Sequence, residues 1–155
     1  MANSHVAHNC ILGDHVILAN GALLAGHVEV QDHAFISGNC LVHQFVRVGT
    51  LALMQGGAGI SQDLPPFTVL SQGNLMCGLN VVGLRRAGFT PEQRLELKKL
   101  YHELFCSGRN LRESVEAARK VFHSAPAKVL LEFVAQAKRG VCSDIGQGAR
   151  PDRDE

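Results

Sequence analysis

Apolar residues recur at every sixth position over the first sixty residues of the chain. Counting in sixes from position 6 meets only aliphatic residues and Met: Val6, Leu12, Leu18, Leu24, Val30, Ile36, Val42, Val48, Met54 and Ile60. Counting in sixes from position 10 meets only small or β-branched residues: Cys10, Val16, Ala22, Val28, Ala34, Cys40, Val46, Ala52 and Ala58. The positions between them are rich in Gly, Asn, Asp, Gln, Ser and His. This part of the chain is therefore a hexapeptide repeat.

A strict period of six fits neither an α-helix nor a meander of β-hairpins. A helix needs apolar residues at i, i+3, i+4 and i+7, and a hairpin meander needs turns every 8–12 residues. The period instead predicts a parallel β-helix in which three short strands make one triangular coil. The aliphatic residue points inward, the small residue fits near a corner, and Gly or Asn takes the turn conformation. Ten hexads at three to a coil give about 3.3 coils, and each coil buries its interior against its neighbours.

The repeat stops at Pro65 and Pro66, because Pro cannot donate a hydrogen bond to a ladder. We therefore expect a β-helix over residues 1–66, followed by a connector over residues 67–89 that carries the sequence GLNVVGLRR. Thr90 is suited to cap a helix and Pro91 to begin it. The apolar spacing that follows predicts an α-helical domain over residues 90–141, with helices at about 91–107, 111–123 and 126–138. Residues 142–155 are polar and aperiodic, so we expect a disordered tail.

Composition and charge exclude several classes of protein. The formal net charge is +1 and there is no Trp, which argues against a nucleic-acid-binding surface. No apolar run approaches the roughly 18 residues of a membrane span. The N-terminus lacks the features of a secretory signal, and the five cysteines are scattered without framework spacing. A cytoplasmic protein with reduced thiols is expected, and Cys10 and Cys40, in the small-residue series, are interpreted as core residues.

Three histidines are brought together by the 18-residue coil. One coil above His8 lies Gly26, next to His27, and two coils above it lies Gln44, next to His43. His5 comes just before His8 on the same coil. A row of histidines over a small Gly suits a groove for sugar or acyl groups, and an imidazole could act there as a general base. The other histidines are interpreted as solvated.

A zinc site is the alternative interpretation of these histidines. Trimeric β-helices of the gamma carbonic anhydrase type hold zinc with three histidines, and His8 and His43 could supply two of them. No histidine follows His43 at the HxxxxH spacing that such sites favour. Because a third ligand is missing, we predict no metal.

Four motifs resemble one family. They are the HxxH of residues 5–8, the AGH of residues 25–27, the HQF of residues 43–45 and the GLNxxGLRR of residues 78–86. Together they resemble the acyl-carrier-protein-dependent UDP-N-acetylglucosamine O-acyltransferases, and the resemblance covers about residues 2–140. It implies a trimeric left-handed parallel β-helix followed by a helical domain. It also implies the first step of lipid A biosynthesis, in which a 3-hydroxyacyl chain passes from acyl carrier protein to the 3-hydroxyl of UDP-N-acetylglucosamine. The carrier thioester is the donor, and no cofactor is expected.

The resemblance also implies roles for individual residues. His8 matches the general base, and backbone N–H groups near Gly26 are candidates for stabilising the oxyanion. Gly56 matches the position that limits acyl chain length, where a Gly leaves room for a longer chain. The other matched positions line the sugar and acyl groove or lie near the nucleotide: His5, His27, His43, Gln44, Asn80 and Arg86.

Three departures from the family pattern bear on activity. Asn9 stands where the family usually has an Asp that orients the base, and Asn cannot stabilise an imidazolium by charge. Val82 and Ala87 replace polar or charged residues near the nucleotide. Family members also have several more coils before the HxxH motif, so the chain resembles the C-terminal portion of the enzyme. We therefore expect the first coil to expose its apolar interior, and either to aggregate or to need a partner.

Other functions remain open on the sequence alone. A truncated trimeric scaffold without a complete site is one alternative, and the related N-acyltransferase of the same pathway is another. The GLNVVGLRR connector and the helical domain favour the O-acyltransferase over the latter and over acetyl-CoA-dependent hexapeptide enzymes. Basic residues on the predicted helices are candidates for contact with the acidic carrier protein: Arg94, Lys98, Lys99, Arg109, Arg112, Arg119 and Lys120.

Overall fold

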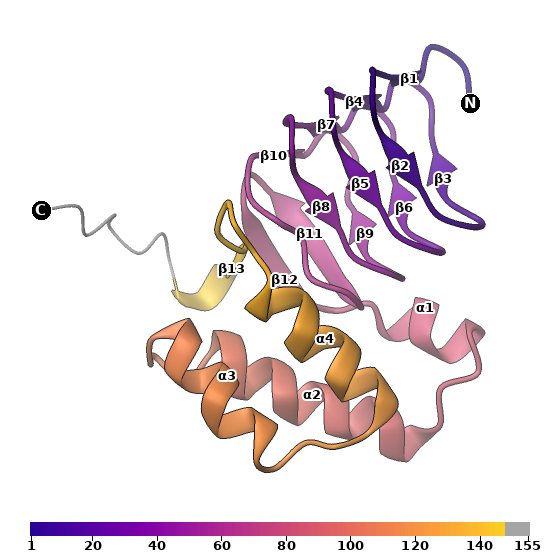
Figure 1. Cartoon of the computed structure of the whole chain (residues 1–155). Coiled ribbons are helices and arrows are strands. Elements are labelled where there is room, and N and C mark those ends of the chain that lie inside the picture. The colour runs from indigo at the N-terminus through magenta and orange to yellow at the C-terminus, as the bar shows by residue number, and fades with distance from the viewer. Residues whose placement is uncertain (148–155) are drawn as a thin grey trace, which may run out of the picture.

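Ten two-residue strands wind into a stack of triangular coils in the computed structural model, which describes residues 1–147 (Figure 1). The strands are β1 (His5–Val6), β2 (Ile11–Leu12), β3 (Ile17–Leu18), β4 (Leu23–Leu24), β5 (Glu29–Val30), β6 (Phe35–Ile36), β7 (Leu41–Val42), β8 (Arg47–Val48), β9 (Leu53–Met54) and β10 (Gly59–Ile60). Every third strand pairs in parallel, which gives a first sheet β1-β4-β7-β10, a second sheet β2-β5-β8 and a third sheet that begins β3-β6-β9. The predicted parallel β-helix is confirmed.

The coils are in strict register. His5 pairs with Leu23, Leu23 with Leu41 and Leu41 with Gly59, so each residue lies on the one eighteen positions earlier. The backbone turns between strands have the same six-residue period, because a residue with positive φ occurs at every sixth position. These residues are Asn3, Asn9, His15, Gly21, His27, His33, Asn39, Phe45, Leu51 and Gly57. Gly, Asn and His tolerate this conformation better than most residues, which explains their frequency between the apolar positions.

Both apolar series of the repeat point into the coils. From Ala22 onward each member of both series is buried, whereas Val6 and Leu12 of the first coil are 40% and 41% exposed. The expectation that the first coil exposes its interior is therefore confirmed.

The predicted end of the β-helix at residue 66 is wrong. Leu64 forms a parallel bridge with Val48, and β11 (Thr68–Gln72) pairs in parallel with β9 through Val69–Leu53 and Leu70–Met54. A further coil is thus partly built within the predicted connector. Pro65 and Pro66 lie at a corner of this coil, outside the strand segments that donate to the ladder. The strand β12 (Leu75–Leu79) then folds back against β11 as an antiparallel hairpin.

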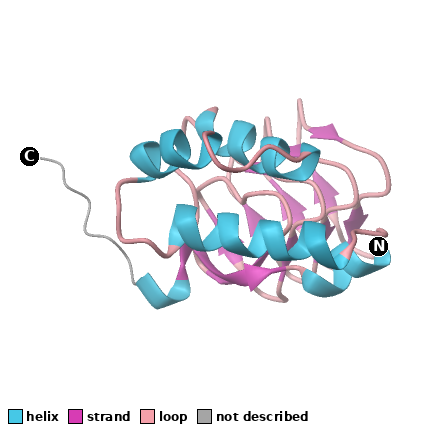
Figure 2. Ribbon diagram, turned by 90° about the horizontal axis from the view of Figure 1, so that it is seen from below, coloured by secondary structure: helices cyan, strands magenta, loops and turns pink. Residues whose placement is uncertain are grey.

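Four helices follow the coils: α1 (Val81–Arg86), α2 (Pro91–Phe105), α3 (Leu111–Arg119) and α4 (Ala125–Ala135). Thr90 caps α2 as predicted, since its hydroxyl accepts from the N–H of Gln93 and the Gln93 side chain accepts from the N–H of Thr90. The second and third predicted helices are found as α3 and α4, each ending three or four residues earlier than expected. Helices α2 to α4 pack together beyond the last coil (Figures 1 and 2). Among residues 1–147 there is no helix with the length and apolarity that a membrane span requires.

The prediction of a disordered tail is wrong for residues 142–147. Cys142 is buried, β13 (Ser143–Asp144) pairs in parallel with β12, and a short 3₁₀ helix, η1 (Ile145–Gln147), follows. The Tyr101 hydroxyl donates to Asp144 Oδ2 at 2.6 Å. Polar composition alone could not reveal these contacts, because they come from distant parts of the chain. The rest of the predicted tail, residues 148–155, lies outside the described residues.

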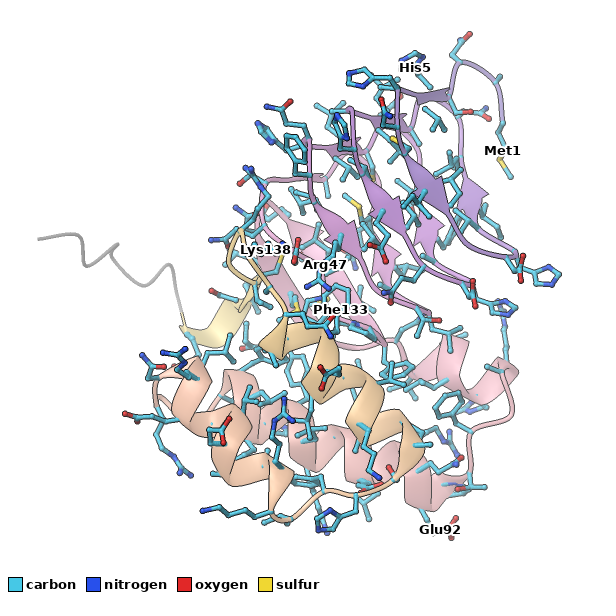
Figure 3. All side chains as sticks on the ribbon, in the orientation of Figure 1. Met1, His5, Arg47, Glu92, Phe133 and Lys138 are labelled. Carbon is cyan, nitrogen blue, oxygen red and sulfur yellow. The ribbon has the colours of Figure 1, made fainter. Side chains whose placement is uncertain are left out.

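A buried ion pair joins the coils to the helices. Arg47, on β8, lies 2.9 Å from the carboxylate of Asp63, and its guanidinium also donates to the backbone carbonyl of Phe133 at 2.8 Å. The guanidinium carbon lies 4.1 Å from the centre of the Phe133 ring. Figure 3 shows the two side chains side by side where α4 meets the coils. Arg47 therefore links the solenoid, the chain after its last full coil and α4.

Replacing Arg47 by Ala should lower the free energy of unfolding by about 3–5 kcal/mol, because Asp63 would stay buried without its partner. Asp63 is 1% exposed, so water cannot replace the guanidinium without structural change. The matched control is Arg119→Ala, which removes an exposed ion pair with Glu132 and should cost less than about 1 kcal/mol. Equal losses in guanidinium chloride unfolding would contradict this assignment.

Candidate active site

The predicted row of histidines lies along the edge between the first and second sheets. The N–H of His27 donates to the carbonyl of His8 at 3.0 Å, and the N–H of Phe45 donates to the carbonyl of Gly26 at 3.2 Å. These bonds stack three turns, residues 8–9, 26–27 and 44–45, which we call the histidine edge. The juxtaposition that the 18-residue period predicts for His8, Gly26–His27 and Gln44 is confirmed.

His8 lies on the histidine edge with its imidazole held from one side. Its Nδ1 is 3.0 Å from Oδ1 of Asn9, which follows it in the turn at a φ of 59°. When Nδ1–H donates to this oxygen, Nε2 carries the free lone pair. His8 is exposed, so a reacting hydroxyl could reach Nε2 without moving the backbone.

Gly26 leaves the space that the imidazole occupies. A Cβ at position 26 would come within 2.6 Å of His8 Cε1 and 2.7 Å of Nε2. The backbone at Gly26 is not in the positive-φ region. Gly is therefore required at this turn by the close approach of the His8 ring.

An aromatic stack continues the histidine edge. The ring of His27 meets that of His8 edge-on, with centroids 5.1 Å apart, and stacks on Phe45 at 4.7 Å. Sequence reasoning missed Phe45, although it lies eighteen residues after His27 and the same period could have found it. Phe45 also carries positive φ, a conformation that costs an ordinary side chain roughly 1–2 kcal/mol. The stack orients His27, one coil from His8.

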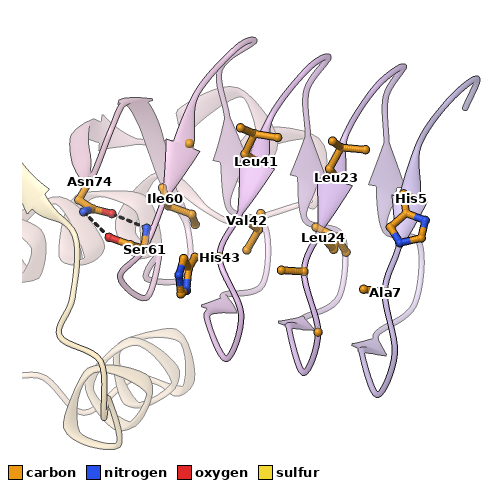
Figure 4. A pocket seen from close by; sticks show the side chains of 13 residues that line it. His5, Ala7, Leu23, Leu24, Leu41, Val42, His43, Ile60, Ser61 and Asn74 are labelled. Atoms are coloured by element: carbon orange, nitrogen blue, oxygen red, sulfur yellow. Dashed lines mark hydrogen bonds between the residues drawn. The ribbon is translucent and has the colours of Figure 1, made fainter.

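A groove of about 670 Å³ runs over the outer face of the first sheet beside the histidine edge (Figure 4). The side chains of Leu23 and Leu41 point outward into it and are 40% and 53% exposed. His5 and His43 line the groove, and Gly26 reaches it from the histidine edge. Such a surface offers an apolar track next to groups that can form hydrogen bonds.

Polar groups close the end of the groove beyond His43. Asn74, from the β11–β12 turn, donates to the Ser61 hydroxyl at 3.0 Å and accepts from the Ser61 N–H at 2.9 Å. Arg139 donates to the Ser61 carbonyl at 3.3 Å, and its Nη2 lies 3.4 Å from Nδ1 of His43. Sequence reasoning missed Arg139, and no local signal could have found it, because it lies 96 residues after His43.

The other predicted site residues do not lie on the histidine edge. Asn80 caps α1 by accepting from the Gly83 N–H, and its amide donates to the carbonyl of Leu51 on the edge between the second and third sheets. Arg86 ends α1 and is exposed. Gly56 lies at the corner between the third and first sheets, where the nearest atom to an added Cβ would be the carbonyl oxygen of Gly38 at 3.6 Å. A single chain therefore brings together the histidines, Asn9, Gly26 and Gln44, but neither Asn80 and Arg86 nor Gly56.

Residues 1–147 contain no cluster of metal ligands, and the two cysteines of the small-residue series are engaged in packing. Within residues 1–147 no group of three or more His, Cys, Asp or Glu side chains is placed to hold a metal ion. Cys40 is buried, its thiol donates to the carbonyl of Gln55, and burial raises the pKa of that thiol. Cys10 is partly buried and donates to the carbonyl of Ala25. Both thus pack as members of the small-residue series, as interpreted.

Comparison with known proteins matches the chain to UDP-N-acetylglucosamine O-acyltransferases. The family model described as UDP-N-acetylglucosamine O-acyltransferase, domain 2, matches residues 63–142. The acyl-[acyl-carrier-protein]–UDP-N-acetylglucosamine O-acyltransferase of Alkalilimnicola ehrlichii is 46% identical over 91% of this chain and 55% of its own length. That of Nautilia profundicola is 42% identical over 93% of this chain and 56% of its own.

Solved structures agree with the sequence comparisons. The UDP-N-acetylglucosamine acyltransferase of Francisella novicida has a TM-score of 0.87 at 34% identity, over 94% of this chain and 54% of the other. That of Campylobacter jejuni has a TM-score of 0.85 at 35% identity, over 90% and 55%. The chain spans about half the length of the curated relatives it matches. It belongs to the UDP-N-acetylglucosamine O-acyltransferase family.

Proposed function

We propose that the chain carries the catalytic base and part of the groove of an acyltransferase. The enzyme transfers a 3-hydroxyacyl group from acyl carrier protein to the 3-hydroxyl of UDP-N-acetylglucosamine, the first step of lipid A biosynthesis. The observation that carries this proposal is the His8 imidazole, held by Asn9 over Gly26, which itself lines a groove with an apolar track. Relatives that bear the name of this activity support it.

The proposed chemistry needs one base and one set of donors. His8 Nε2 takes the proton from the sugar 3-hydroxyl as that oxygen attacks the thioester carbonyl. Backbone N–H groups near Gly26 stabilise the tetrahedral oxyanion, which then collapses, breaks the C–S bond and releases the carrier thiolate. The thiolate takes up the proton that His8 holds, so the base is regenerated. Leu23 and Leu41 support the acyl chain, and no metal or cofactor takes part.

A complete site needs a second copy of the chain in this proposal. Asn80 and Arg86, which we assign to the nucleotide, lie on a different edge from His8. Copies packed side by side as a homotrimer would place these residues of one copy opposite the histidine edge of the next. Arg86 suits the diphosphate through charge-assisted hydrogen bonds. Gly56, at the far side of the first sheet from His8, would limit the acyl chain. We place the protein in the cytoplasm, where five free thiols stay reduced.

Replacing His8 by Ala should reduce acyl transfer by roughly 10²–10⁴-fold, because the general base is lost. The measurement is mass-spectrometric detection of acylated UDP-N-acetylglucosamine after incubation with 3-hydroxyacyl carrier protein. His123→Ala is the matched control, since His123 is an exposed histidine between α3 and α4, on neither the histidine edge nor the edge that Asn80 contacts. Product from neither parent nor variant would refute catalysis by this chain alone and favour a trimeric scaffold.

Replacing Gly26 by Ala should reduce turnover roughly tenfold to a hundredfold, because the new methyl group displaces the His8 ring. The fold should lose less than about 1 kcal/mol, since the clash is with the end of an exposed side chain. Gly38→Ala is the control, because Gly38 has the same place in its hexad and only the Asn20 carbonyl lies near, at 3.4 Å. Kinetics and thermal unfolding separate the two effects. Full activity in Gly26→Ala would show that the position of the His8 ring does not matter.

Replacing Asn9 by Asp should raise turnover on the order of tenfold, because a carboxylate stabilises the imidazolium that forms as His8 takes the proton. Asp tolerates positive φ as Asn does, so the turn should keep its shape. Asn39→Asp makes the same change at an equivalent turn and should leave kcat as it is. A kcat for Asn9→Asp equal to or below that of the parent would contradict the orienting role.

A further inference from the structure

A second groove, of about 540 Å³, lies between β12, α1 and α2. It shares no residue with the groove beside the histidine edge, and none of its residues takes part in the proposed acyl-transfer step. Strand β12 belongs to the hairpin after the last coil, α1 follows it in the chain, and α2 is the first helix of the predicted helical domain. Its size lies in the range of small-molecule sites, which are about 300–1,000 Å³.

One face of α2 gives the groove a cationic wall. Arg94, Lys98 and His102 are spaced four apart, so they lie on the same side of the helix, and all three line the groove. Within residues 1–147 neither Arg94 nor Lys98 forms an ion pair. Arg94 Nε is buried, and no acceptor among the described residues meets it. A buried N–H without a protein acceptor is uncommon, and this one belongs to a side chain that lines the groove.

Aliphatic side chains from β12, α1 and α2 also line the groove. Leu79, Val81, Leu84 and Leu95 line it, and Val81 and Leu95 are 45% and 53% exposed. Large aliphatic side chains at a groove mouth offer a surface for a hydrocarbon group. The groove thus combines aliphatic side chains with two unpaired cations.

The acidic group in the groove is already engaged. Asp144 Oδ2 accepts from the Tyr101 hydroxyl at 2.6 Å, and its Oδ1 accepts from the Gly146 N–H at 2.9 Å. Burial, together with the hydrogen bond to Asp144, raises the pKa of Tyr101, so this hydroxyl remains a donor. Asp144 therefore leaves Arg94 and Lys98 free for an outside anion, and the lining keeps a positive charge excess.

We propose that this groove binds one amphiphilic anion, whose carboxylate contacts Arg94 and Lys98 and whose short hydrocarbon chain covers Leu79, Val81 and Leu95. The site is separate from the histidine edge and does not depend on the acyltransferase proposal. The positive charges of Arg94 and Lys98 favour an anionic head group. The aliphatic side chains favour a ligand with a hydrocarbon chain over an anion without one, such as acetate.

Alkylation of Cys77 tests the proposal directly, with decanoate as the probe. Cys77 is exposed and lines the groove, whereas Cys10 lies on the first coil. Decanoate should slow the reaction of Cys77 with iodoacetamide in a saturable way and leave the rate at Cys10 unchanged, as measured by peptide mass spectrometry. Decanol and decyltrimethylammonium, which lack the anionic head, should protect at least tenfold less well.

Two double variants with the same change in net charge complete the test. Arg94→Gln with Lys98→Gln should raise the half-protecting decanoate concentration about tenfold or more, because two charge-assisted contacts are lost. Lys99→Gln with Lys120→Gln removes exposed charges outside the groove and should leave it unchanged. Thermal unfolding checks that all variants fold. The proposal fails if decanoate does not protect Cys77, if decanol protects equally well, or if both double variants lose protection to the same extent.

Discussion

Backbone hydrogen bonds between successive coils are the interaction on which the rest of this structure depends. They hold each residue directly against the one eighteen positions later, so positions far apart in sequence become neighbours at every corner. Register is maintained because the aliphatic and small residues must all point inward, and a shift of one residue would expose both series. His8, Gly26 and Gln44 meet for this reason. The candidate active site is therefore a direct consequence of the repeat.

The corners are where this fold can place chemistry. Side chains within the coils pack the core, while turn residues point outward and take positive φ at every sixth position. Asn and His accept that conformation at little cost, and here they also form the candidate base and its partner. Phe45 and Leu51 accept it less readily. At Phe45 the strain accompanies stacking on His27, so local stability is exchanged for an ordered imidazole in the candidate site.

The helical domain completes the groove and fixes its own position on the coils. Arg47 joins Asp63 and the backbone of Phe133, and Arg139 reaches back from beyond α4 to Ser61 and His43. Tyr101 holds Asp144, and with it the segment after Cys142, against the hairpin. Helix α2 of the same domain forms the cationic wall of the second groove. The segment after α4 thus contacts the candidate active site, whereas α2 faces the groove that we propose for an anion.

The sequence by itself determined the coil, its register, the row of histidines over Gly26 and the cap of α2, because these depend on periodicity and on short-range contacts. Only the tertiary structure decided that β11 extends the solenoid past two prolines and that residues 142–147 pair with the hairpin. It also decided that the Asn80 amide donates to the carbonyl of Leu51, on a different edge of the coils from His8. The contact of Arg139 with His43 and the groove beside Arg94 were also decided by the tertiary structure, since both arise where segments distant in sequence pack together. No local pattern encodes such contacts.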